Sequence, residues 1–272
     1  MKIFLISLCT IAILAVVYIF IGENILTVEE YQFKSDKITN PVRIVAISDL
    51  HDREFGDDNK DLVNKIKEQD PDIITILGDM NLESNSNDTV VISLLIRLVN
   101  IAPVYYCLGN HEMAVFDSTS IVSDIESTGA ILLDDEIVKT TICGNDFSIG
   151  GISLFYFWDG KAGATGSVLS RDSTDKNFKL LLCHYPEYYM WWLKKENIDL
   201  ILSGHAHGGL VRLPFVGGLY APEQRWFPKY SKGYYDDENL STMLVTTGLW
   251  RSSWLPRVNN PPEIMVVNIT RE

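Results

Sequence analysis

This 272-residue sequence contains the segment Ile44-Val45-Ala46-Ile47-Ser48-Asp49-Leu50-His51, which gives the strongest indication of the fold. A short run of apolar, mostly β-branched residues is typical of a buried strand, and this one ends in a carboxylate and an imidazole. Four more apolar runs, at residues 73–77, 104–108, 180–183 and 200–203, are each followed directly by Gly, Asp, Asn or His residues. Segments with helical periodicity lie between the early runs, at 58–69, 88–100 and 118–127. Strands that alternate with helices predict an α/β domain, and consecutive strand-like runs from residue 131 onward predict a second, more antiparallel sheet.

All five histidines of the chain follow one of these runs. A single Asp or His after a strand is usually a turn or surface residue, so each position alone is weak evidence. Taken together, the positions are stronger evidence for a functional site, because sites in open α/β sheets form beyond the carboxyl ends of the strands. We therefore expect one region to contain Asp49, His51, Asp79, Asn110, His111, His184, His205 and His207.

This set of side chains indicates a metal site. Imidazole with carboxylate suits Mn, Fe, Zn, Co or Ni, and the identity of the metal stays open. A catalytic ion usually takes three protein ligands, so these residues are too many for one ion. They are enough for two divalent metal ions that share a bridging carboxylate, a pair that can act on both oxygens of an in-line phosphoryl displacement.

The ordered blocks resemble the calcineurin-like metallophosphoesterases. They are Asp49-Leu50-His51, Gly78-Asp79, Gly109-Asn110-His111-Glu112, His184 and Gly204-His205-Ala206-His207. The resemblance implies a four-layer double β-sandwich flanked by helices, with a dinuclear site at one end. It places Asp49, His51, Asp79 and His207 on the first metal, with Asp79 bridging, and Asn110, His184 and His205 on the second.

The same resemblance gives His111 a catalytic role rather than a ligand role. A metal-bridging hydroxide would attack phosphorus in line, and His111 would assist the leaving group, with Glu112 beside it as an orienting residue. Residues 205–214 also look like the bacterial membrane-associated branch of the family. The alternative is a phosphoesterase-fold binding scaffold that has lost its chemistry; no expected ligand position is missing, which favours the hydrolase.

The N-terminus predicts a membrane anchor. Residues 3–21 contain no charged side chain and would form about 28 Å of helix, close to the thickness of a bilayer core. Lys2 precedes this run and Glu23, Glu29 and Glu30 follow it, which predicts a single-pass protein with a cytoplasmic N-terminus and an extracytoplasmic catalytic domain. We expect a transmembrane anchor at 1–22, a juxtamembrane segment at 23–41 that includes an edge strand near 28–34, and the metallophosphoesterase domain at 42–272.

Charge limits the partners. A formal net charge of -13 argues against nucleic acid, which is bound by excess Lys and Arg. A phosphorylated small molecule or lipid remains as the expected substrate, and the sequence does not choose between monoester, diester and pyrophosphate, nor does it fix the oligomeric state.

Arg53, Arg251 and Arg257 are each equally consistent with a phosphate contact and with an ordinary structural role. The aromatic runs at 155–158 and 188–192 fit either core packing or a lipid-facing surface, and we expect no structural disulfide.

Overall fold

The structure is a computed structural model of the chain. It describes residues 2–82, 89–115, 120–152, 174–236, 241–251 and 255–272, with only part of the side chains in the N-terminal helix. The aromatic run at 155–158 lies outside the described residues.

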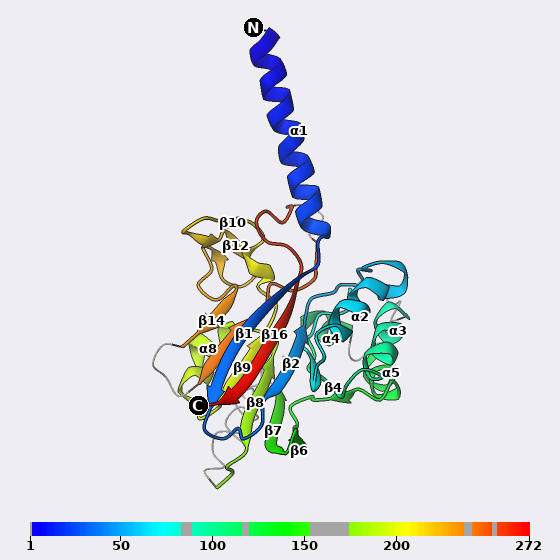
Figure 1. The fold of residues 1–272 in the computed structure, drawn as a ribbon, viewed down its shortest axis with the longest axis vertical. Helices are drawn as coiled ribbons and strands as arrows, with labels where there is room; N and C mark the ends of the chain where they lie inside the picture. The colour runs from blue at the N-terminus through cyan, green and yellow to red at the C-terminus, as the bar shows by residue number, and fades with distance from the viewer. Residues whose placement is uncertain (1, 83–88, 116–119, 153–173, 237–240, 252–254) are drawn as a thin grey trace.

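Two six-stranded sheets form the centre of the molecule (Figure 1). The first sheet contains, in spatial order, β1 (Thr27–Ser35), β16 (Glu263–Arg271), β2 (Val42–Ile47), β3 (Ile73–Ile76), β4 (Val104–Tyr106) and β5 (Ile131–Leu132). The second contains β14 (Gly233–Tyr235), β15 (Thr242–Val245), β9 (Leu200–Ser203), β8 (Phe178–Cys183), β7 (Asn145–Ile152) and β6 (Ile137–Ile142). The strands expected from the five apolar runs are therefore confirmed.

Helices and short hairpins complete the fold. The helices are α1 (Lys2–Asn24), α2 (Lys60–Lys67), α3 (Thr89–Leu98), α4 (Asn110–Val115), α5 (Ile121–Ser127) and α8 (Glu187–Trp191), with single 3-10 turns η1 (Asp57–Asn59), η2 (Leu193–Lys195) and η3 (His207–Gly209). Two small antiparallel hairpins follow η3: β10 (Arg212–Leu213) with β11 (Gly217–Gly218), and β12 (Tyr220–Ala221) with β13 (Arg225–Trp226).

The core is layered, as the alternation along β2 illustrates. Val45 and Ile47 pack with α2, α3 and α5 on one face of the first sheet. Ile44 and Ala46 point to the other face, where the two sheets pack together. The outer face of the second sheet packs against α8 through a third buried cluster that includes Ile201 and Tyr189. The order helices, sheet, sheet, helix is the expected double β-sandwich of the metallophosphoesterase fold.

The second sheet is more antiparallel than the first, as expected, with two antiparallel pairings against one, but its centre is parallel. Its four central strands, β7, β8, β9 and β15, are mutually parallel, and only the outer pairs β6–β7 and β14–β15 are antiparallel. The physical reason is burial: β8 and β9 are buried at every residue, between the first sheet and α8. Strands covered on both faces are typical of parallel sheets. A continuous apolar run in the sequence does not indicate whether its strand is parallel or antiparallel to its neighbours.

The segment that precedes β2 belongs to the first sheet. β1 pairs in parallel with β16 over its whole length, from Thr27 with Glu263 to Ser35 with Arg271. The edge strand expected near 28–34 is therefore present, although the sequence placed it in a juxtamembrane segment.

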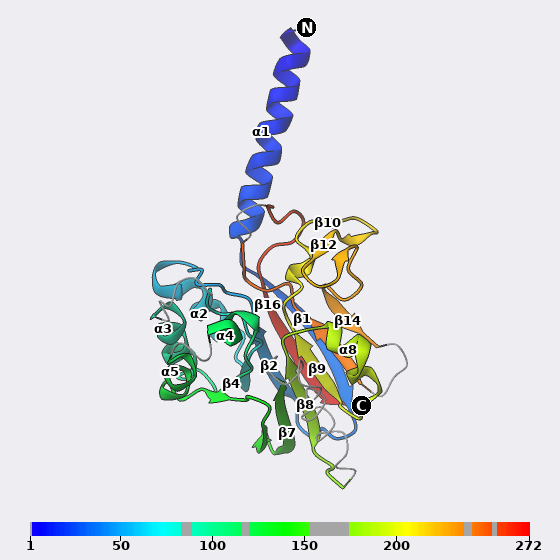
Figure 2. The same cartoon turned by 180° about the vertical axis from the view of Figure 1, so that it is seen from behind.

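α1 projects away from the sheets, at the end of the molecule where β10 and β12 lie (Figures 1 and 2). Within the described residues, we find no helix that is both long enough and apolar enough to cross a membrane. The membrane span expected at 1–22 is not supported by this search.

Candidate metal centre

The predicted site residues come together at the carboxyl ends of five strands. Asp49 and His51 follow β2, Asp79 follows β3, and Asn110 and His111 begin α4 after β4. His184 follows β8 in the second sheet, and His205 and His207 follow β9. Because β2, β3 and β4 are parallel to one another, and β8 is parallel to β9, their carboxyl ends lie at the same edge of each sheet.

The ligand atoms form three overlapping groups, each with atoms within 4.8 Å of one another. The first group is Asp49, His51 and His207, with the Asp49 Oδ1 atom 3.6 Å from His207 Nδ1. The second is Asp79, His184 and His205, with Asp79 Oδ2 3.1 Å from His184 Nε2. The third joins His51, Asp79 and His111. Asp79 belongs to the second and third groups and His51 to the first and third, so these two residues connect all the ligand atoms into one cluster.

Several of these buried atoms have no hydrogen-bond partner among the residues that the structure describes. They are Asp49 Oδ1, both ring nitrogens of His51, Asn110 Oδ1, His205 Nε2 and His207 Nδ1. Leaving a buried polar atom unpaired costs about 1–3 kcal/mol, so a concentration of such atoms in one place calls for an absent partner. Divalent cations fit this donor set, which consists of imidazole nitrogens and carboxylate or amide oxygens.

The backbone is strained at the same positions. Asp49, His51, Asp79, His205 and His207 all have positive φ, between 46° and 61°. The left-handed region is disfavoured for residues other than Gly, and clusters of such residues are a feature of functional sites. The strain turns these side chains away from the strand direction and toward one another.

Glu112 holds two of the loops in place. Its carboxylate accepts hydrogen bonds from the backbone N–H groups of Asp79 (2.8 Å), Met80 (2.6 Å) and Gly109 (2.9 Å) and from the Tyr106 hydroxyl (2.8 Å). The expectation that Glu112 orients the His111 side chain finds no support in these contacts, because all four partners are elsewhere. Glu112 instead fixes the loop that carries Asp79, and a Cβ on Gly109 would lie only 2.2 Å from Asp79 Oδ1.

Burial and charge set the protonation of the site. Burial lowers the pKa of His51 and of His205 to about 3, so both imidazoles are neutral, which is the form that binds metals. Burial raises the pKa of Asp49 to about 7. Burial also opposes charge on His184, but the adjacent Asp79 carboxylate outweighs it and raises the His184 pKa to about 10. A cation bound by Asp79 and His184 would therefore have to displace the proton that the Asp79 carboxylate stabilises on His184.

Trp250 covers one side of the site, and sequence reasoning missed it. Its ring centroid lies 4.5 Å from that of His207 and 5.3 Å from that of His51. The available signal was the apolar run at 243–246, which is followed by Thr247 and Gly248, just as the other apolar runs at the site are followed by Gly or polar residues. A Cβ on Gly248 would lie 2.6 Å from Asp49 Oδ2, so this loop also packs directly on the site.

Two of the three candidate arginines have structural roles. Arg257 is 1% exposed and donates to the backbone carbonyls of Gly248, Trp250, Thr247, Asn260 and Pro261. Arg53 donates to the carbonyls of Leu249 and Glu23. Both therefore hold the Trp250 loop rather than a phosphate. Arg251 is exposed.

The aromatic run at 188–192 is divided between the core and the surface. Tyr188 and Tyr189 are buried against the second sheet, whereas Met190, Trp191 and Trp192 are 42–47% exposed.

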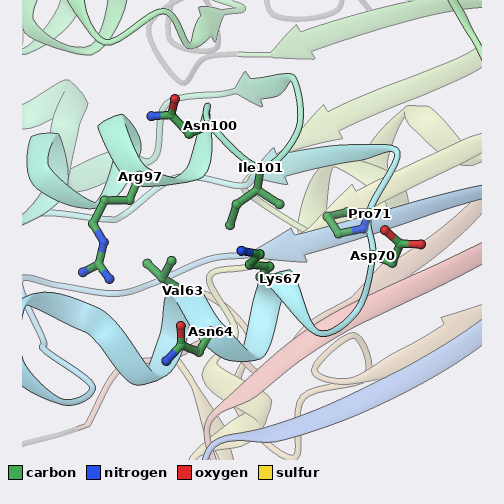
Figure 3. A pocket seen from close by; sticks show the side chains of 8 residues that line it. All are labelled: Val63, Asn64, Lys67, Asp70, Pro71, Arg97, Asn100 and Ile101. Atoms are coloured by element: carbon green, nitrogen blue, oxygen red, sulfur yellow. The ribbon is translucent and has the colours of Figure 1, made fainter.

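A separate pocket of about 510 Å³ lies between α2 and α3 (Figure 3). Its lining includes Lys67 and Arg97 but no member of the three metal groups, so it is not part of this site.

Comparison with known proteins agrees with this geometry. The family model for calcineurin-like phosphoesterases matches residues 42–209. The chain belongs to this family. It is therefore a metal-dependent phosphoesterase, and its clusters of Asp and His side chains could bind divalent metal ions.

Several curated relatives carry related names. The chain is 28% identical over 260 residues to the uncharacterized metallophosphoesterase YkuE of Bacillus subtilis, covering 92% of this chain and 87% of that protein. It is 28% identical over 188 residues to the phosphodiesterase YaeI of Escherichia coli, covering 67% of this chain and 66% of that one. Among solved structures, the phosphopantetheinyl hydrolase PptH of Mycobacterium tuberculosis aligns with a TM-score of 0.46 at 17% identity, covering 76% of this chain and 89% of that chain.

Proposed function

We propose that the chain hydrolyses phosphoesters at a two-metal centre. The observation that carries the proposal is that Asp79 belongs to two of three connected groups of ligand atoms, and that several buried atoms of these groups have no hydrogen-bond partner among the described residues. Asp49, His51, Asp79 and His207 would hold one ion, and Asp79, Asn110, His184 and His205 the other. When bound, the ions would supply an activated water nucleophile and positive charge for the phosphoryl oxygens.

His111 has the properties of a proton donor to the leaving group. Its side chain is 24% exposed, whereas those of His51, His184 and His207 are 1–8% exposed, so it faces the side from which a substrate would enter. Its Nε2 atom is 3.9 Å from Asp79 Oδ2, and its backbone N–H donates to Asp79 Oδ1 at 2.8 Å. A proton held on this ring could be transferred to the departing oxygen, a step that general acid catalysis typically accelerates 10²–10⁴-fold.

The decisive experiment separates ligands from the proton donor. Full-length chain is loaded with Mn²⁺, its metal content is measured by mass spectrometry, and hydrolysis of bis-p-nitrophenyl phosphate and p-nitrophenyl phosphate is followed. We expect two ions per chain, loss of metal and activity in Asp79→Asn, and full metal with roughly 10²-fold lower kcat in His111→Asn. Glu126→Gln on the exposed face of α5 is the matched control. A folded, two-metal protein that turns over neither substrate would favour the scaffold alternative.

For the natural substrate we propose a lipid-linked or cell-envelope phosphate. The support is α1, where the described apolar side chains include Ile13, Leu14, Val16 and Phe20, each 62–65% exposed. Exposed apolar side chains of this kind are unfavourable in water, so we propose that the helix anchors the chain in a membrane, with the catalytic domain on the extracytoplasmic side. Preferential hydrolysis of dispersed lipid phosphates over soluble nucleotides is expected, and the reverse preference would count against this substrate class.

The topology has its own test. A C-terminal alkaline phosphatase fusion should be active in a bacterial host, since that reporter requires export, whereas a fluorescent fusion that matures in the cytoplasm would contradict the proposed orientation.

A further inference from the structure

Two hairpins next to the metal centre expose large apolar side chains. We call the surface formed by Leu213, Phe215, Val216, Trp226 and Phe227 the hairpin surface; these side chains are 41–108% exposed. Phe215 has φ +65° in a turn closed by a hydrogen bond from the Val216 N–H to the Leu213 carbonyl at 3.2 Å, so the turn presents its ring to solvent. Concentrations of exposed apolar side chains on a soluble domain mark interaction sites.

The two hairpins form one unit. The N–H of Leu219 donates to the Val211 carbonyl at 2.8 Å, and the N–H of Phe227 donates to the Leu219 carbonyl at 2.9 Å. The rings of Tyr220 and Trp226 pack edge to face, with centroids 5.5 Å apart. The apolar side chains of β10–β11 and β12–β13 therefore belong to one ordered surface.

The charge of this segment is opposite to that of the rest of the chain. Residues 210–229 contain Arg212, Arg225 and Lys229 against Glu223 alone. The remaining residues contain 20 basic and 35 acidic side chains, from totals of 23 and 36. Arg225 and Lys229 are exposed beside the aromatic residues. Aromatic and apolar side chains together with basic ones are the composition of a surface that binds anionic lipid.

The hairpin surface is tied both to α1 and to the metal centre. The Tyr18 hydroxyl of α1 donates to Asn259 Oδ1, and Asn259 Nδ2 donates to the Arg212 carbonyl at 3.2 Å. Asn260 Nδ2 donates to the carbonyls of His207 (2.8 Å) and Leu210 (3.0 Å), which link the first hairpin to a site residue. Figures 1 and 2 both show β10 and β12 at the end of the domain from which α1 leaves.

We propose that the hairpin surface docks on an anionic phospholipid bilayer. Phe215, Trp226 and Phe227 enter the interfacial region, where aromatic side chains are favoured, and Arg225 and Lys229 meet lipid phosphates. Because the surface continues directly from His207, docking brings the metal centre close to the bilayer. Docking requires no turnover, so this inference holds or fails independently of the proposed reaction.

The experiment places an environment-sensitive fluorophore on the hairpin surface of the full-length chain. Phe215→Cys is made with Cys9→Ser and Cys143→Ser, since the remaining cysteines, Cys107 and Cys183, are buried. Ile96→Cys in the same background is the matched control, because Ile96 is also apolar and 49% exposed but lies on α3.

With vesicles of phosphatidylglycerol and phosphatidylcholine, we expect blue-shifted emission and quenching by brominated acyl chains at position 215 and neither at 96. Sedimentation with the vesicles confirms that the chain is bound. Vesicle-bound chain with no shift at 215, or with equal shifts at both positions, would overturn the proposal. A shift that grows with protein concentration in the absence of lipid would show self-association through this surface and would also overturn it.

The basic residues are tested separately. The double variant Arg225→Gln and Lys229→Gln should weaken the lipid response at position 215 by about fivefold per charge at low salt. Lys60→Gln with Lys195→Gln removes the same charge from exposed positions outside residues 210–229 and should change it less than twofold. Equal losses in both pairs would show that net charge, and not this surface, determines the response.

Discussion

Glu112→Gln tests whether the scaffold under the metal centre rests on one buried carboxylate. Glu112 is fully buried and accepts two hydrogen bonds on each oxygen, from Asp79 N–H and Gly109 N–H on Oε2, and from Met80 N–H and Tyr106 hydroxyl on Oε1. The least costly amide orientation keeps the oxygen on the Asp79 and Gly109 side. Its NH₂ group then donates to the Tyr106 oxygen, a bond that replaces the one donated by the Tyr106 hydroxyl, and the Met80 N–H is left without an acceptor.

The magnitude follows from these bonds. One unpaired buried N–H costs about 1–3 kcal/mol, and two bonds that change from charge-assisted to neutral lose about 1 kcal/mol each. Burial raises the pKa of Glu112, so removing the buried charge offsets part of that loss. The expected net destabilisation is about 2–4 kcal/mol, together with weaker metal binding because the Asp79 loop is no longer held in place.

The assay is denaturant unfolding in chelator, which isolates the scaffold from the metal, followed by a separate metal titration. Glu126→Gln, at an exposed position on α5, makes the same chemical change and should stay within about 0.5 kcal/mol of the original chain. A Glu112→Gln protein with unchanged unfolding free energy and unchanged metal affinity would refute the reasoning, because four observed hydrogen bonds would then contribute nothing.

Three further predictions concern the same centre. Gly248→Ala puts a Cβ 2.6 Å from Asp49 Oδ2 and should lower metal affinity in calorimetry, whereas Gly129→Ala, which also has positive φ but open space around it, should not; equal affinities would contradict the packing argument. Arg257→Lys loses bonds to several of its five carbonyl partners and should destabilise the fold by about 2–4 kcal/mol in denaturant unfolding, while Arg271→Lys at an exposed position should be neutral. The pKa of His184 is raised to about 10 and that of Asp49 to about 7, so metal binding at pH 7 must displace the His184 proton and about half a proton from Asp49. Calorimetry in buffers of different ionisation enthalpy should detect between one and two released protons, and metal affinity should rise roughly 10²-fold per pH unit near pH 6 and about tenfold per unit near pH 8; no proton release would disprove these charge states.

The sequence predicted that these side chains come together because each of them follows a strand within a few positions. Asp49 and His51 are placed by β2 and Asp79 by β3, and both strands are recognisable from local hydrophobicity. Once neighbouring strands run in parallel, their carboxyl ends must meet. Alternate residues of β2 point to opposite faces of the sheet, so one set packs against the helices and the other against the second sheet.

The strands, the helices between them, the family and the residues that could bind metal were all predictable from the sequence. Features that depend on partners far apart in the chain became visible only in the folded protein. The parallel centre of the second sheet is one example, since an apolar run has the same composition in either direction. Arg257 and Trp250 are others, because a guanidinium or an aromatic ring has no assigned role until folding brings its carbonyls or imidazoles to it. Local patterns specify which residues can make an interaction, and packing over long sequence separations determines which of those interactions form.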